Sequence, residues 1–265
     1  MPDAVSHFPA PYQELFHKVE HGLRNRLRYG IPQDPLTIGF PRTPDPEAKQ
    51  KLMAIAEEVR ECRACELGDI RRDRYGKAVP GAGPAQARVM IVGEAPGHYE
   101  ESLRDKRAMG FGMPFVGPSG KLLDKILESI QLQRQDVHIG NVCCCRPPKN
   151  RDPYVAEIDA CLPYLYRKIE IVQPWVIIAM GRFAAQVLCE GAHRGEAVGD
   201  LLGKLHPYVH DARIKVWPMK HPAYLLHQAR GMVGYYEEML IIGAAIKKAM
   251  ETLENPNQCR PFELP

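Results

Sequence analysis

The chain has 265 residues and a formal net charge of +3, with 45% hydrophobic and 25% charged residues. This ordinary composition and length exclude a collagen-like chain, a wholly disordered chain and a miniprotein that depends on disulfides. No apolar run reaches the ~18 residues that a bilayer span needs, and residues 1–11 lack the basic-then-apolar layout of a secretory signal. We therefore expect a cytoplasmic protein, whose small positive charge permits binding to nucleic acid without requiring it.

The first forty-seven residues differ in pattern from the rest. Residues 12–28 predict an amphipathic helix, because Phe16, Val19, Leu23 and Leu27 form one apolar stripe. A linker follows, with five prolines between residues 32 and 46, which is too rich in proline for regular structure. We expect residues 1–47 to form a separate segment, residues 48–252 the main domain and residues 253–265 a tail.

Strand-like and helix-like segments alternate along the main domain. Helices are expected at residues 47–60, 119–130, 154–172, 181–188 and 232–250, and strands at residues 88–92, 137–142, 175–179 and 214–219. This alternation predicts an α/β fold, a three-layer α/β/α sandwich around a short, mainly parallel four-stranded sheet. Ligands of such sheets bind at the carboxyl ends of the strands.

Four polar or aromatic residues lie at or near these strand ends. Glu94, beside a glycine-proline turn, can hold a water or a cation, although such a turn is often only structural. Phe115, on a loop of glycines and prolines, can stack on a flat ligand or fill the core. The amide of Asn141 suits one edge of a pyrimidine or caps a turn, and His221 can stabilise a developing oxyanion. Their occurrence at successive strand ends favours a functional site.

Cysteines form two spaced pairs. In a reducing cytoplasm the eight cysteines are not expected to form structural disulfides, which favours metal or cluster ligation. Cys62 and Cys65 are a chelating pair, and Cys145 and Cys161 form a second pair on a strand end and a helix. Four thiolates fit a tetrahedral zinc ion or an iron–sulfur cluster, and the spacing alone does not choose between them. Cys144 is an alternative to Cys145 in this set.

With these residues in place, the chain resembles the family 4 uracil-DNA glycosylases, which carry a [4Fe–4S] cluster. The resemblance covers about residues 50–250. It rests on Gly93-Glu-Ala-Pro-Gly97, Pro114-Phe-Val-Gly117, Asn141 with Cys145-Arg-Pro-Pro148, Cys161, and His221-Pro-Ala-Tyr-Leu-Leu226. It implies a uracil-DNA glycosylase-like fold and a monofunctional glycosylase that flips uracil out of DNA. Hydrolysis of the N-glycosidic bond would then leave an abasic site for base excision repair.

The resemblance also implies a role for each site residue. The cluster would be a structural one, ligated by Cys62, Cys65, Cys145 and Cys161. In the pocket, Glu94 would lie near the attacking water and Phe115 would stack on the flipped base. Asn141 would read the Watson–Crick edge of uracil, Glu100 would block the methyl group of thymine, and His221 would stabilise charge on uracil O2.

Two features depart from the family pattern. Ten residues lie between Glu101 and Gly112, where the family has about two. This insertion contains Arg104, Lys106 and Arg107, which we expect to contact the DNA backbone electrostatically, the alternative being a solvated loop.

The second departure is His227, which stands where the family commonly has an arginine. Leu225 or Leu226 just before it can wedge into the duplex as apolar side chains do in bent complexes. A related subgroup traps its substrate through a histidine that is absent from residues 146–151, so we expect turnover.

The expected partner is uracil-containing DNA, double or single stranded, and the expected assembly is a monomer. Two alternatives remain open. One is a noncatalytic protein that binds uracil or damaged DNA through the same pocket, and the other is a zinc-stabilised protein of another activity.

Overall fold

The computed structural model describes residues 45–102, 110–129, 132–192, 198–202 and 204–223. The helices predicted at 12–28 and 232–250 and the tail from 253 lie outside these residues. So do the predicted DNA contacts Arg104, Lys106, Arg107, Leu225 and Leu226, as well as His227.

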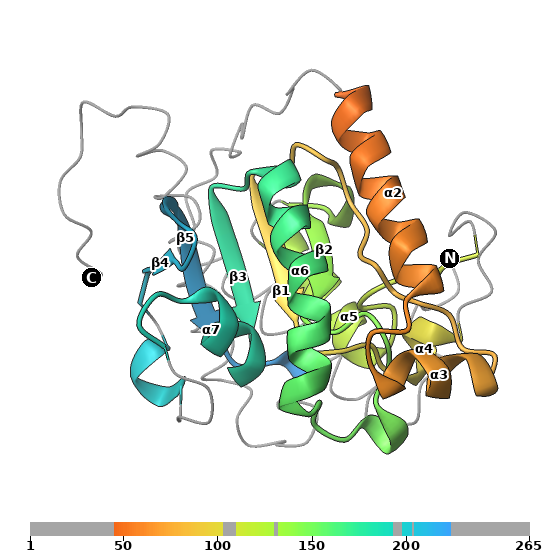
Figure 1. Cartoon of the computed structure of the whole chain (residues 1–265). Helices are drawn as coiled ribbons and strands as arrows, with labels where there is room; N and C mark the ends of the chain where they lie inside the picture. Colours follow the sequence, from red (N-terminus) through yellow and green to blue (C-terminus); the bar gives the residue numbers. More distant parts are fainter. Residues whose placement is uncertain (1–44, 103–109, 130–131, 193–197, 203, 224–265) are drawn as a thin grey trace, which may run out of the picture.

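A five-stranded sheet, with strand order β2-β1-β3-β5-β4, forms the centre of the protein (Figure 1). The strands are β1 (Val89–Gly93), β2 (His138–Asn141), β3 (Val176–Met180), β4 (His206–Tyr208) and β5 (Asp211–Met219). β2, β1, β3 and β5 pair in parallel, which confirms the predicted α/β class and the four predicted strands. β4 adds an antiparallel fifth strand that the sequence did not indicate.

The parallel strands form because their sequences are continuous apolar runs. Every residue of β1 and β3 is buried, as expected for strands that are covered on both faces. β4 has three residues and contains Pro207, so it has neither an apolar run nor an alternating pattern. A proline in a strand is typical of the edge of a sheet, which is where β4 lies.

Both edges of the sheet are closed by neighbouring chain. At the β2 edge, Ala82 and Ile139 exchange two backbone hydrogen bonds, of 2.8 and 2.7 Å. At the β4 edge, the Pro207 carbonyl accepts from the N–H of Glu190 at 2.9 Å, and the N–H of Val209 donates to the Leu188 carbonyl at 3.0 Å. The edge strands therefore find main-chain partners within the molecule.

Helices precede and connect the strands. Within the described residues they are α2 (Pro46–Glu61), α3 (Glu66–Asp73), α4 (His98–Glu101), α5 (Pro118–Ser129), α6 (Val155–Val172) and α7 (Arg182–Leu188), with short 3-10 turns at Arg134–Asp136, Pro148–Asn150 and Val198–Leu201. The Asp45 carboxylate caps α2 by accepting from the N–H of Ala48 at 3.0 Å, and Pro46 occupies the first helical turn. Figure 1 shows α6 and α7 over one face of the sheet, with α2 beside α6.

α6 joins the sheet to the cysteine-bearing part of the chain. Its apolar positions Ile158, Leu165 and Ile169 are buried in the same core cluster as residues of β1 and β3. Helix α2 packs against α6 and buries Ile55 and Val59. No helix in the described part of the chain is long and apolar enough to cross a membrane.

Candidate active site

A cavity of about 330 Å³ lies where the parallel strands end. Its lining includes Glu94 after β1, Asn141 at the end of β2, Phe115 before α5, and His221 after β5. The structure therefore brings together the four residues that the sequence placed at or near successive strand ends. The volume is near the lower end of the range of ~300–1,000 Å³ for small-molecule sites, which suits one small planar ligand.

His221 is oriented by its own turn. The N–H of Ala223 donates to Nδ1 of His221 at 3.1 Å, so Nδ1 acts as an acceptor and the ring proton resides on Nε2. Burial lowers the pKa of His221 to about 4, which keeps the imidazole neutral near pH 7. The residue therefore presents a neutral N–H donor.

Phe115 is held in a conformation that few residues adopt. Its φ is +53°, in the left-handed region, and its side chain is buried. The ring lies 5.5 Å from that of His221, at an interplanar angle of 31°. Backbone strain of this kind persists where the surroundings enforce it, and such positions cluster at functional sites.

Gly93 gives Phe115 and Asn141 the space that they occupy. A Cβ atom at this position would come 2.6 Å from Cζ of Phe115 and 2.5 Å from Oδ1 of Asn141. Nδ2 of Asn141 is buried and makes no well-formed hydrogen bond in the described structure, although the Asn141 side chain lies close enough to the Glu100 carboxyl group to lower its pKa. Unpartnered buried donors are rare in folded proteins, so this one is available for a ligand.

Two carboxyl groups in the cavity hold protons more tightly than usual. Burial raises the pKa of Glu94 to about 7; the Asp152 charge raises it further, and the Arg182 charge opposes the shift. Burial also raises the pKa of Glu100, on α4, to about 7, whereas hydrogen bonds with the backbone of Phe115 and Gly97 lower it by a smaller amount. Oε2 of Glu100 is buried and unpartnered, so this group can also meet a ligand.

The profile of the uracil DNA glycosylase superfamily matches residues 80–241 of the chain. The chain belongs to this superfamily. A type-4 uracil-DNA glycosylase of Saccharolobus solfataricus is 38% identical to it, over 77% of the chain and 90% of that protein. A second, from Archaeoglobus fulgidus, is 37% identical over 77% of the chain and 98% of that protein. A third, from Sulfurisphaera tokodaii, is 40% identical over 66% of the chain and 76% of that protein.

The four cysteines that we expect to bind a cluster lie at four different elements of this chain. Cys62 caps the end of α2, Cys65 caps the start of α3, Cys145 follows β2, and Cys161 lies on α6. Cys65 is near enough to both Cys62 and Cys145 for their charges to interact. Within the described residues, no three histidine, cysteine or acidic side chains converge as ligands of a single metal ion. A cluster binds each thiolate through a different iron, so its ligands need not meet at one point.

The surroundings of these sulfurs suit thiolates. The N–H of Ala64 donates to Sγ of Cys62 at 3.4 Å, and the N–H groups of Leu67 and Gly68 lower the pKa of Cys65 against the larger effect of burial. Burial raises the pKa of Cys145 to about 12, while the Arg71 guanidinium beside it acts in the opposite direction. Backbone donors and a cation at buried thiols fit a group that binds them as anions.

Cys144 has a different environment from that of Cys145. Its side chain is buried in an apolar cluster with Ile55 and Val59 of α2. Cys145 instead lies near Cys65, which favours it as the fourth ligand. Cys144 nevertheless hydrogen-bonds with Cys161, so its side chain contacts one of the four expected ligands.

A buried ion-pair network, which sequence reasoning missed, joins the pocket to the cysteine loop. Glu101 accepts from Nη2 of Arg74 at 2.8 Å and from Nη1 of Arg146 at 2.8 Å, and its side chain is only 5% exposed. Arg146 is part of the Cys-Arg-Pro-Pro motif, but no sequence pattern indicates that its acidic partner lies 45 residues away. The network fixes the start of the insertion, at Ser102, against the Cys145 loop.

A second unforeseen pair lies beside Glu94. Asp152 and Arg182 form a salt bridge, and both act on the pKa of Glu94 in opposite directions. These residues come from the loop before α6 and from the first residue of α7. Neither position carries a motif that could have identified it.

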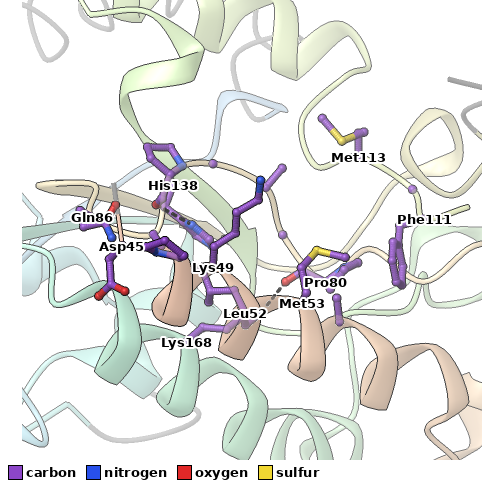
Figure 2. A pocket seen from close by; sticks show the side chains of 18 residues that line it. Asp45, Lys49, Leu52, Met53, Pro80, Gln86, Phe111, Met113, His138 and Lys168 are labelled. Atoms are coloured by element: carbon purple, nitrogen blue, oxygen red, sulfur yellow. Dashed lines mark hydrogen bonds between the residues drawn. The ribbon is translucent and has the colours of Figure 1, made fainter. Parts of the chain in front are cut away.

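The larger cavity of the described structure lies elsewhere. It measures about 640 Å³ and is lined by α2, the 80–86 loop and His138, at the start of β2 (Figure 2). It contains none of the residues that the sequence singled out, so the pocket at the strand ends remains the candidate active site.

Proposed function

We propose that this chain releases uracil from DNA by hydrolysing the N-glycosidic bond, which leaves an abasic site for base excision repair. The observation that carries the proposal is the convergence of Glu94, Asn141, Phe115 and His221 on one cavity at the strand ends. Membership of the uracil DNA glycosylase superfamily supports the same activity. The reacting base is unreachable inside a duplex, so it must first be flipped out, at a cost of a few kcal/mol.

Asn141 and Phe115 would recognise the flipped base. The Asn141 amide offers a donor for uracil O4 and an acceptor for N3–H, and its Nδ2 makes no well-formed hydrogen bond in the described structure. The Phe115 ring would stack on the base, since its loop and Gly93 hold it in place. Cytosine presents the opposite donor and acceptor pattern at these atoms, so the amide would select uracil.

Glu100 would exclude thymine. Thymine differs from uracil by a methyl group at C5, and a buried carboxyl group beside C5 would leave it no room. The unpartnered Oε2 of Glu100 is consistent with a carboxyl group that faces the base.

His221 and Glu94 would carry the bond-breaking step. As the bond breaks, negative charge builds on the base and positive charge on the sugar. The Nε2–H of His221 would donate to uracil O2, and one such donor is worth roughly 2.7–4 kcal/mol in comparable sites. The Glu94 carboxylate would hold the attacking water and accept its proton. No cysteine or lysine is required as a nucleophile, so the product is an abasic site and the enzyme turns over.

Cys62, Cys65, Cys145 and Cys161 would hold a [4Fe–4S] cluster. The backbone donors at Cys62 and Cys65 and the Arg71 cation at Cys145 support this choice. The group would supply a covalent cross-link between the α2–α3 turn, the Cys145 loop and α6. This role is structural, so none of the chemical steps above passes through it.

Contacts with DNA beyond the base would come from Arg104, Lys106 and Arg107, which are cations of the insertion, and from Leu225 or Leu226 as a wedge. The four pocket residues all come from one chain, so a monomer would suffice for activity.

The test is base release from a labelled oligonucleotide with one uracil, as single and double strands, with protein purified without air. The same oligonucleotide with thymine is the substrate control. Release confined to uracil and lost in His221→Ala would support the proposal. A protein that binds the uracil oligonucleotide but releases no base would overturn the activity and favour a binding role.

A further inference from the structure

Two cations are buried beside the cysteines and have no acidic partner among the described residues. Arg71 on α3 and Lys168 on α6 are 4% and 3% exposed, and neither forms a salt bridge with any residue in the described ranges. Nη2 of Arg71 donates to the Arg60 carbonyl at 2.7 Å, and its Nε has no partner in the structure. Nζ of Lys168 donates to the Pro80 carbonyl at 2.7 Å, a bond drawn in Figure 2.

Buried charges of this kind need an anion. Removing an ammonium or guanidinium group from water costs several kcal/mol, and one or two carbonyl contacts do not offset that cost. The Glu101 carboxylate packs on Gly76 together with the Arg71 stem, but it already pairs with Arg74 and Arg146. The region therefore has more positive than negative charge among its described side chains.

Besides these carbonyl groups, both cations have cysteine side chains as neighbours. Nζ of Lys168 lies 3.9 Å from Sγ of Cys144, which in turn hydrogen-bonds with Cys161. Arg71 hydrogen-bonds with the Cys145 side chain and also acts on Cys144 through its charge. A neutral thiol has no charge with which to balance a cation. Four thiolates around an iron–sulfur core carry a net negative charge, which would balance them.

We propose that Arg71 and Lys168 are the counter-charges of the cluster, and that they set its reduction potential and stabilise its binding. This inference rests on the cofactor part of the proposed function. Positive charge near a redox group favours the reduced form, so removing it should shift the potential to more negative values. Arg71 contacts a ligand directly and Lys168 acts through Cys144, so the shift should be larger for Arg71.

The experiment compares four variants with the wild-type holoprotein. Arg71→Met and Lys168→Met remove the charges but keep most of the side-chain volume. Arg71→Lys keeps the charge without the planar guanidinium. Arg213→Met is the matched control, since Arg213 is exposed on β5 and pairs with Asp211. The potential is measured by redox titration with electron paramagnetic resonance, and iron and sulfide are counted per chain.

The expected result is a negative shift in Arg71→Met, a smaller negative shift in Lys168→Met, and a potential near that of the wild type in Arg71→Lys and Arg213→Met. Loss of iron and sulfide on warming should follow the same order. The inference would be overturned if Lys168→Met had the wild-type potential and Arg71→Met either had the wild-type potential as well or failed to fold.

Uracil release, assayed on the same samples, separates this inference from the proposed activity. Wild-type protein that releases uracil but contains no iron or sulfide would overturn the inference and leave the activity standing. Protein with the expected shifts but no uracil release would support the inference and overturn the activity.

Discussion

The backbone N–H of Ala223 and Nδ1 of His221 are 3.1 Å apart and form a hydrogen bond within a single turn. This bond leaves the ring proton on Nε2, the nitrogen that is free to meet a substrate. Burial keeps the ring neutral by lowering its pKa to about 4. A short turn after β5 thus determines which nitrogen carries the proton, and burial determines the charge of the ring.

Replacing this donor should slow base release without unfolding the protein. In His221→Ala we expect kcat to fall roughly 10²–10³-fold, as for loss of one preorganised donor in other enzymes. Single-turnover assays with the uracil oligonucleotide measure the change. His210→Ala is the control, because His210 is an exposed histidine outside the cavity, and it should keep the wild-type rate. A His221→Ala enzyme at the wild-type rate would contradict the role.

Activity should rise with pH through about 7. The pKa of Glu94 is raised to about 7, so below that pH the carboxyl group is protonated and cannot accept a proton from water. His221 is neutral above about pH 5 and adds no second change in this range. The measurement is the single-turnover rate between pH 5 and 9.

Two variants show which carboxyl group causes this pH dependence, because the pKa of Glu100 is also raised to about 7. Glu94→Gln should be slow at every pH, with no rise near 7. Glu100→Gln should keep both the rise and the discrimination against thymine, because the amide has nearly the same size as the carboxyl group. If the rise disappears only in Glu100→Gln, the titrating group has been assigned to the wrong residue.

Gly93→Ala should displace two side chains that line the pocket. The added Cβ would come within 2.6 Å of Phe115 and 2.5 Å of Asn141, so both side chains must shift. A displacement of about 1 Å can cost roughly 100-fold in rate, and we expect a loss of that order in kcat/KM for uracil release. Gly199→Ala is the matched control, because a Cβ there would meet nothing within 4 Å. Equal kcat/KM in the two variants would show that the packing on Gly93 does not matter.

Glu101→Gln should lower stability more than a comparable surface change. The carboxylate is 5% exposed and pairs with Arg74 and Arg146, so its loss leaves two partly buried cations without an anion. We expect the free energy of unfolding to fall by about 3 kcal/mol. In Glu58→Gln, which breaks an exposed pair with Arg167, the loss should be much smaller, because water screens the pair. Urea unfolding of both variants measures the two losses in the free energy of unfolding. Losses of equal size would show that burial of the Glu101 pairs does not increase their contribution.

The parallel part of the fold could be predicted from the sequence because the signal is local. β1 and β3 are unbroken apolar runs, and α6 carries its apolar residues at helical spacing. β4 and α3 were not predicted, because neither has such a local signal. β4 has only three residues, and α3 is a short polar helix whose buried residues include Arg71.

The pocket was predictable where residues follow strands, since parallel strands end at one edge of the sheet. Glu94, Asn141 and His221 were found in this way. The partners of Glu101 could not be found, because a salt bridge between residues 27 and 45 positions apart depends on how the loops fold back. The buried position of Arg71 was also hidden, because an arginine on a short polar helix is indistinguishable in sequence from a solvated one.

The closed edges of the sheet have a consequence for how the protein behaves at high concentration. An open edge offers a row of free main-chain groups on which another copy can build a strand, the usual beginning of aggregation. Here Ala82 occupies that position along β2, and residues 188–190 occupy it along β4. At these positions a neighbouring molecule could add a strand only by displacing a main-chain bond that the protein already makes, which disfavours pairing of copies through the edges of the sheet.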